Sequence, residues 1–212
     1  MSQLKRRTLC ATVFAAAAFS MVGAAAQAAP GVRDAGAEQF VQTGAQRVIS
    51  VLADRSMGES QKAAIFHRAI DDLADVPKIT NFVLGKYARS ITPAQRAQFT
   101  PTFRAYAESV YRNRINDYHG ESLRVTGSTV RKPGDVIVNT QISGGQLSQP
   151  VAISWRVLGA GGAWKVVDVQ FKGVWLAITQ QQDFVSTIDN AHGDVDVLIA
   201  QLRREAQQPA SR

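Results

Sequence analysis

The chain has 212 residues, of which 24 are Lys or Arg and 17 are Asp or Glu, giving a net charge of +7 at neutral pH. This excess is modest and no basic run carries interleaved aromatic residues, so the composition gives no support to a nucleic-acid-binding protein. The length fits a single domain with an ordinary hydrophobic core.

The first residues have the organisation of a secretory signal peptide. Basic residues at 5–7 precede a short apolar run over 9–22, and Ala26-Gln27-Ala28 matches an A-x-A cleavage site. A membrane-spanning helix needs about 20 apolar residues, more than this run provides. We therefore predict a signal peptide over 1–28. The only cysteine, Cys10, lies within it, so the exported chain would be held together without disulfides.

The first half of the mature chain has helical periodicity. Apolar residues recur at helical spacing over 39–53, 60–73 and 76–87, and Thr92-Pro93-Ala94-Gln95 has the form of a helix start with a capping box. Pro101 predicts either a kink or two abutting helices. Beyond it, the apolar surface is wider than a one-sided surface helix needs, so this helix should touch apolar material on more than one side.

The period then changes to two, which predicts four strands over 122–131, 135–142, 150–158 and 163–171. Short glycine-containing turns separate them, so the strands should form an antiparallel meander. Two further helices follow, divided near Gly193. Helices, sheet and helices in this order predict an α+β fold. We expect one domain over 29–206 and a disordered tail over 207–212.

Catalytic and metal-binding motifs are missing from the sequence. His67, His119 and His192 lack partners at metal-ligand spacing, and we expect His67 to be solvated. There is no nucleophile elbow, phosphate-binding loop or dinucleotide fingerprint. We therefore predict a protein that is not an enzyme and binds no cofactor and no metal.

One enzymatic alternative stays open. Asp168 alternates with Trp164 and Val166 along the last predicted strand. If this face points inward, Asp168 could be the general base of a small-molecule enzyme with a cone-like α+β fold.

The segment Gly173-Val174-Trp175-Leu176 joins the last strand to the next helix. If that helix starts at Val174, its core stripe is Val174, Ile178, Gln181, Val185 and Ile188, and Trp175 and Leu176 point elsewhere. Two large apolar side chains in such a place would be exposed to water unless another apolar object lies there. We therefore predict that they line or close an apolar pocket.

Four short segments together match the pattern of a known family. They are Phe82-Val83-Leu84-Gly85-Lys86-Tyr87, Thr92-Pro93-Ala94-Gln95-Arg96-Ala97-Gln98-Phe99, Asp168-Val169-Gln170-Phe171-Lys172-Gly173-Val174 and the stretch from Gly193 to Leu202. In these segments the chain resembles the MlaC family, the periplasmic phospholipid-carrying component of the Mla ABC transport system, also described as toluene-tolerance auxiliary proteins. Two departures from the family pattern are Trp175, where a small residue is common, and Gln181, where an arginine is common.

The resemblance implies a curved four-stranded antiparallel sheet and surrounding helices that enclose an apolar pocket for acyl chains, with the headgroup near solvent. It also implies a periplasmic carrier that shuttles phospholipid between an inner-membrane ABC transporter complex and an outer-membrane lipoprotein complex, a process linked to outer-membrane lipid asymmetry. A related branch is linked to hopanoids, so another apolar lipid is an alternative cargo. A non-lipid interaction module with a filled core is a further alternative. The predicted lipid-binding residues are Phe82, Val83, Tyr87, Phe103, Tyr106, Val110, Tyr111, Val138, Ile153, Trp155, Val169, Phe171, Trp175 and Leu176.

Overall fold

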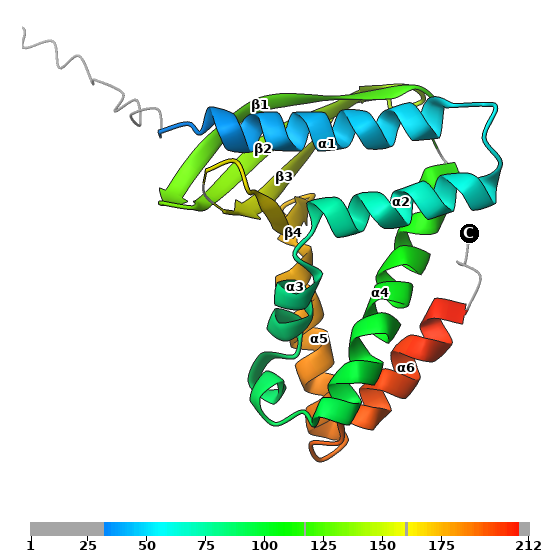
Figure 1. The fold of residues 1–212 in the computed structure, drawn as a ribbon, viewed down its shortest axis with the longest axis vertical. Helices are drawn as coiled ribbons and strands as arrows, with labels where there is room; N and C mark the ends of the chain where they lie inside the picture. Colours follow the sequence, from blue (N-terminus) through cyan, green and yellow to red (C-terminus); the bar gives the residue numbers. More distant parts are fainter. Residues whose placement is uncertain (1–31, 117, 160, 208–212) are drawn as a thin grey trace, which may run out of the picture. The chain divides into compact units, whose positions relative to one another are not determined.

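The computed structural model describes residues 32–116, 118–159 and 161–207, and it has the α+β fold that the sequence predicts (Figure 1). The predicted signal peptide lies outside these residues, and so does the tail beyond Gln207, the last residue of the final helix. No helix in the described part is long and apolar enough to cross a membrane. The elements are α1 (Ala35–Ala53), α2 (Glu59–Leu73), α3 (Val76–Val83), the 3-10 helix η1 (Gly85–Arg89), α4 (Pro93–Asn116), β1 (Glu121–Lys132), β2 (Asp135–Gly144), β3 (Val151–Leu158), β4 (Lys165–Phe171), β5 (Val174–Trp175), α5 (Leu176–Asn190) and α6 (Val195–Gln207).

The sheet is an antiparallel meander in the order β1-β2-β3-β4-β5. It has one strand more than predicted, because Val174 and Trp175 pair with the end of β4. Lys172 and Gly173, with φ of 49° and 82°, form the two-residue turn that suits the twist of a hairpin. Two residues are too few to show alternation, so β5 could not be predicted from hydrophobic periodicity.

The first hydrophobic core lies between α1 and one face of the sheet. Ala37 of α1 and Val136, Val138 and Val157 of the sheet are fully buried there, together with Val41. The paired residues of β2 and β3 put these valines on the same side of the sheet, as the two-residue period of a strand requires. The α1 helix approaches β1 and β2, so it covers one part of this face.

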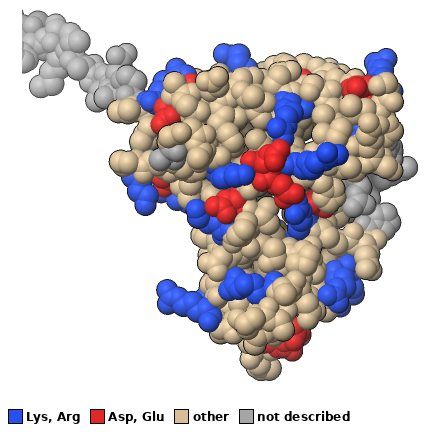
Figure 2. Space-filling model, viewed as in Figure 1, with Lys and Arg blue, Asp and Glu red and all other residues tan. Residues whose placement is uncertain are grey.

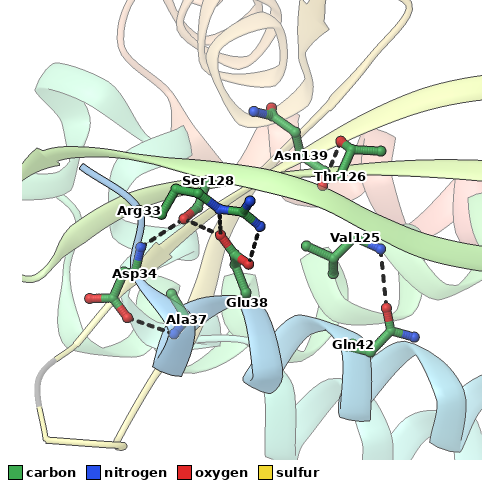
Figure 3. Close-up of polar contacts among 9 residues, drawn as sticks. All are labelled: Arg33, Asp34, Ala37, Glu38, Gln42, Val125, Thr126, Ser128 and Asn139. Carbon is green, nitrogen blue, oxygen red and sulfur yellow. Dashed lines mark hydrogen bonds and ion pairs between the residues drawn. The ribbon is translucent and has the colours of Figure 1, made fainter. Parts of the chain in front are cut away.

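The start of α1 is fixed to β1 by a polar network (Figure 3). Asp34 caps the helix by accepting a hydrogen bond of 2.9 Å from the amide of Ala37. Ser128 accepts a hydrogen bond from the Asp34 amide at 2.8 Å and donates one to Glu38 at 2.7 Å. Arg33 donates two hydrogen bonds to Glu38, at 2.8 and 2.7 Å, and this partner lowers the pKa of the Glu38 carboxyl.

The same helix also protects the free edge of β1. The Gln42 side chain accepts a hydrogen bond from the amide of Val125 at 3.1 Å and donates one to the carbonyl of Leu123 at 3.3 Å. The amide of Val130 donates to the carbonyl of Val32 at 3.1 Å. An edge strand otherwise exposes such groups to other chains, so residues 32–42 close the sheet on this side.

A second core lies among α3, α4, α5 and α6, and Figure 1 shows these helices on the side of α2 away from α1. Its centre is Phe184, whose ring centroid lies 6.3 Å from Phe99, 6.0 Å from Phe103 and 6.3 Å from Tyr106. The helix α4 continues through Pro101, so the alternative of two abutting helices is wrong. Pro101 is exposed, and water can therefore bond the carbonyl that loses its donor.

Replacing Phe184 with alanine should lower the free energy of unfolding by about 3–5 kcal/mol, because the side chain is only 3% exposed and contacts three aromatic rings. Urea denaturation of the mature chain measures this loss. Phe82→Ala is the matched control, since Phe82 is 38% exposed, and it should cost roughly 1 kcal/mol or less. Equal losses for the two variants would contradict the position of Phe184 at the centre of this core.

Candidate functional site

A row of apolar side chains continues along the sheet beyond the part that α1 covers. The strand register aligns Val138 with Trp155 and Trp155 with Val169, and it aligns Ile153 with Phe171. All five predicted sheet residues therefore lie on one face. Val138 is fully buried in the first core, whereas the other four are half-buried. We call Ile153, Trp155, Val169 and Phe171 the sheet row.

The polar atoms next to the sheet row are satisfied within the sheet. The indole N–H of Trp155 donates a hydrogen bond of 2.9 Å to the hydroxyl of Thr140, which donates one of 2.9 Å to the carbonyl of Ile153. Both groups are thereby paired without any outside partner. This face therefore presents apolar surface to any molecule that packs on it. Such a surface favours an apolar ligand over one that needs hydrogen bonds.

Two residues that sequence reasoning missed extend the row. Ile142 and Val151 face each other across β2 and β3 on the same side as Ile153, and both are half-buried. The alternation of residues 151–158 already contained this information for Val151. The apolar surface therefore reaches the end of the sheet at which the β2–β3 connection lies.

The predicted helical residues are divided between two environments. Val83 is fully buried in the second core, whereas its neighbour Phe82 is 38% exposed. Consecutive residues of a helix point about 100° apart, so the two side chains lie in different surroundings, and their shared role in one pocket stays a prediction. The hydroxyl of Tyr87 donates to Asp189, which also lies 2.7 Å from the Lys86 ammonium. The hydrogen bond to Asp189 raises the pKa of the Tyr87 hydroxyl.

Phe103 and Tyr106 of α4 pack at the margin of the second core and remain half-buried. The Tyr106 hydroxyl lies 3.4 Å from the side-chain oxygen of Gln180, and burial raises its pKa. The side chains of Val110 and Tyr111, the next predicted residues on this helix, lie outside the described part of the structure. Tyr106 and Phe103 thus keep part of their surface free of the core.

The joint between β5 and α5 differs from its prediction. Trp175 pairs with Gln170, whereas Val174 pairs with Phe171. Trp175 therefore leaves the sheet on the face opposite the sheet row, and its role in lipid binding stays a prediction. Leu176 is half-buried at the first residue of α5.

The predicted core stripe of α5 is also partly wrong. The helix starts at Leu176 rather than Val174, because the hairpin takes up the two preceding residues. Its buried residues are Ala177, Phe184 and Ile188, so only Ile188 of the predicted stripe is fully buried. Val174 and Ile178, which were expected in the core, are 50% and 41% exposed.

Asp168 does not share a face with Trp164 and Val166. The register shifts between Arg156 and Val157, so that Val166 pairs with Val157 and Asp168 pairs with Arg156. Val167 is therefore the extra residue of a β-bulge, which reverses the alternation. The face assignment on which the enzymatic alternative rested is wrong.

The Asp168 carboxylate instead joins β4 to the start of α5. One oxygen accepts hydrogen bonds of 2.8 Å from the amides of Val169 and Ala177. Ala177 lies in the first turn of α5, where amides lack helical partners. The side chain is buried, and burial raises the pKa of this carboxyl. These contacts give Asp168 a structural role.

Two hollows occur away from these residues. One, of about 300 Å³, lies between α4 and α6, and a much smaller one lies between α1 and α2. Neither is lined by a predicted lipid-binding residue. Within the described ranges, no three His, Cys, Asp or Glu side chains gather as a metal site would require. The candidate site is therefore the half-buried sheet row.

The helices of this α+β fold cover only part of the apolar face of the sheet. Such a fold is suited to binding an apolar ligand. The chain belongs to the MlaC family, whose model matches residues 42–204. The fold is similar to that of the phospholipid-binding protein from Ralstonia solanacearum, solved in complex with a phospholipid, with a TM-score of 0.71 and 22% identity. The match covers 82% of this chain and 99% of that one. At this identity the likeness concerns the fold.

Replacing Asp168 with alanine should lower the free energy of unfolding by about 1–2 kcal/mol, because it removes the acceptor of two backbone hydrogen bonds. Asp168→Asn keeps an acceptor oxygen and removes the buried charge, so it should be nearly neutral at pH 7. Urea denaturation of both variants at pH 7 measures the difference. A loss for Asp168→Asn as large as that for Asp168→Ala would contradict the capping role.

The pH dependence of Asp168→Asn gives an independent check. Burial raises the folded-state pKa of Asp168 above its unfolded value. The contribution of this group to stability is thus greatest below about pH 4, the unfolded value, and is lost as the pH rises through the folded pKa. The variant lacks this loss, so its stability relative to the parent chain should increase with pH over that window.

Proposed function

We propose that the mature chain is a periplasmic phospholipid carrier and that the sheet row packs against the acyl chains. The observation that carries this proposal is the half-burial of Ile153, Trp155, Val169 and Phe171 on a face whose remaining part is a closed core. Membership of the MlaC family supports it, as does the phospholipid bound to the Ralstonia solanacearum protein of similar fold.

The free energy of lipid transfer from water favours a carrier that presents a large apolar surface. A two-chain phospholipid carries on the order of 30 methylenes, and each gains about 0.8 kcal/mol on leaving water. A carrier must offset most of that free energy in an aqueous compartment, and it must do so without reacting with its cargo. Apolar contact supplies the attraction without a specific charge pair that would have to be broken on release.

The transfer between membrane complexes is proposed from what is known of the MlaC family. The carrier receives phospholipid at one membrane complex and delivers it at another, an inner-membrane ABC transporter complex and an outer-membrane lipoprotein complex, and so contributes to outer-membrane lipid asymmetry. The predicted signal peptide over 1–28 supports export. The carrier needs no cofactor for this work and catalyses no reaction.

Native mass spectrometry of the mature chain, purified from the periplasm, tests the cargo. We expect bound phospholipid that exchanges with labelled phospholipid from vesicles. Identification of the released lipid distinguishes a phospholipid from another apolar lipid such as a hopanoid. A chain that carries no lipid and takes up none from vesicles would contradict the proposal.

Replacing Ile153 with asparagine should reduce the amount of phospholipid bound at equilibrium by about tenfold or more, since an unpaired amide against acyl chains costs roughly 1–3 kcal/mol. Ala152→Asn is the matched control, because Ala152 is exposed on the opposite face of the same strand. Uptake of fluorescent phospholipid at a fixed vesicle concentration compares the two, with circular dichroism to confirm folding. Equal binding by both variants would remove the sheet row from the site.

A further inference from the structure

A lysine lies at the end of the sheet row. Phe171 is the last residue of β4 and the last residue that β4 contributes to the row. Lys172 follows it and is exposed, and its Nζ lies 5.4 Å from the centroid of the Phe171 ring. An ammonium at this distance is attracted by the face of an aromatic ring. A positive charge is therefore placed against the surface that we propose for an acyl chain.

The apolar face has a closed end and an open end. Past Trp155 it continues to Val157, which is fully buried in the first core. Past Ile153 it continues to Val151, which is only half-buried. Because Ile153 pairs with Phe171, the β4–β5 turn lies level with Val151 at the open end. An acyl chain along the row gains most by pointing its methyl end to the buried side, and its headgroup then lies beside the β4–β5 turn.

The backbone of Lys172 has a conformation that lysine disfavours. Lys172 and Gly173 both have positive φ, 49° and 82°, as a two-residue hairpin turn of type I′ requires. Asn, Asp and Gly suit such a turn, because left-handed backbone crowds the Cβ of other side chains. Among the described non-glycine residues only His192 shares this feature. Such a conformation in a long cationic residue points to a function for its side chain.

The charge of Lys172 is available to a ligand. None of the described carboxylates forms an ion pair with it, whereas several basic side chains of α1, α4 and the sheet are opposed by carboxylates. These pairs are Arg33 with Glu38, Arg47 with Asp72, Arg104 with Asp71 and Glu108, and Arg156 with Asp135. Lysine forms strong charge-assisted hydrogen bonds with phosphate oxygens. Lys172 can therefore offer such bonds at the end of the row.

The charges over α2 do not suit a phosphate. Figure 2 shows acidic side chains gathered there between basic ones. Arg104 of α4 pairs with Asp71 of α2 and donates a hydrogen bond of 3.1 Å to Glu108. His67 Nδ1 lies 2.6 Å from the same Glu108 oxygen, so the expectation that His67 is simply solvated is wrong. A phosphate in this group would meet carboxylates as well as cations, and Lys172 is therefore the better partner.

We propose that Lys172 contacts the phosphate of the phospholipid headgroup and favours anionic phospholipids over zwitterionic ones. This inference rests on the proposed carrier function and adds its selectivity. The ammonium attracts the phosphate of any phospholipid, but in a zwitterionic lipid the positive charge of the headgroup opposes it. The contact is exposed to water, and exposed ion pairs are weak. It therefore biases which lipid is bound without holding that lipid against release.

Competitive loading from mixed vesicles tests this contact. The delipidated mature chain is incubated with vesicles of equal parts phosphatidylglycerol and phosphatidylcholine with identical acyl chains, and native mass spectrometry gives the ratio of the two complexes. Both lipids leave the same surface, so attraction of the basic protein to that surface does not affect the ratio. Lys172→Asn should lower the ratio of bound phosphatidylglycerol to bound phosphatidylcholine about two- to fivefold relative to the parent chain.

Matched controls separate this contact from general effects of charge and stability. Lys172→Arg keeps the positive charge and should keep the parent ratio. Arg124→Gln removes the same charge from an exposed residue on the opposite face of the sheet, where Arg124 pairs with Gln141, and it should also keep the parent ratio. Lys172→Asn should unfold at the same urea concentration as the parent chain or a higher one, since asparagine suits this turn. Glycerol phosphate, added at the concentration of the vesicle lipid, should not change the parent ratio, because it lacks the acyl chain that packs on the row.

The outcomes separate this selectivity from the carrier function. A ratio for Lys172→Asn equal to that of the parent chain, or an equal fall for Arg124→Gln, would overturn the headgroup contact and leave the carrier function standing. A fall in glycerol phosphate as large as that of Lys172→Asn would assign Lys172 to free phosphate and would also overturn the contact. A parent chain that takes up neither phospholipid would overturn the carrier function itself.

Discussion

The apolar face of the sheet extends further than the helix that covers it, and the candidate site follows from this mismatch. Where α1 crosses β1 and β2, Val136 and Val138 are fully buried. Further along the same face, Ile153 and Phe171 keep part of their surface free. A sheet with one apolar face must cover all of it or accept contact with water. Here α1 covers part of the face and the rest stays half-buried, and this remaining part is the proposed surface for an acyl chain.

Two local features of the backbone decide which side chains share that face. The bulge at Val167 reverses the alternation of β4, so Val169 and Phe171 join the row while Asp168 turns to the other side. The turn at Lys172 and Gly173 then sends Trp175 to the side of Gln170. The bulge thus places the Asp168 carboxylate on the face opposite the sheet row, where it accepts a hydrogen bond from the first turn of α5. One extra residue serves both the apolar site and the attachment of the helix.

The sequence was sufficient for the α+β fold, for the order of its main helices and strands except β5, and for the apolar face of residues 151–158. Hydrophobic periodicity is local information, and the alternation of Ile153 and Trp155 could be read directly. The face assignment of Asp168 failed because a single inserted residue exchanges the two faces of a strand, and nothing in residues 164–171 marks Val167 as the extra one. The ion pair of Asp71 with Arg104 could not be predicted for a different reason. The two residues are 33 positions apart, and only the packing of α2 near α4 makes them partners.

The two cores are separate, and each one stabilises its own half of the molecule. Phe184 and Val138 are each buried within one core. The described contacts between α2 and α4 are polar and partly exposed, and exposed ion pairs are individually weak in water. The fold of each half therefore depends on its own buried apolar residues, and the half-buried sheet row contributes less to stability than either core.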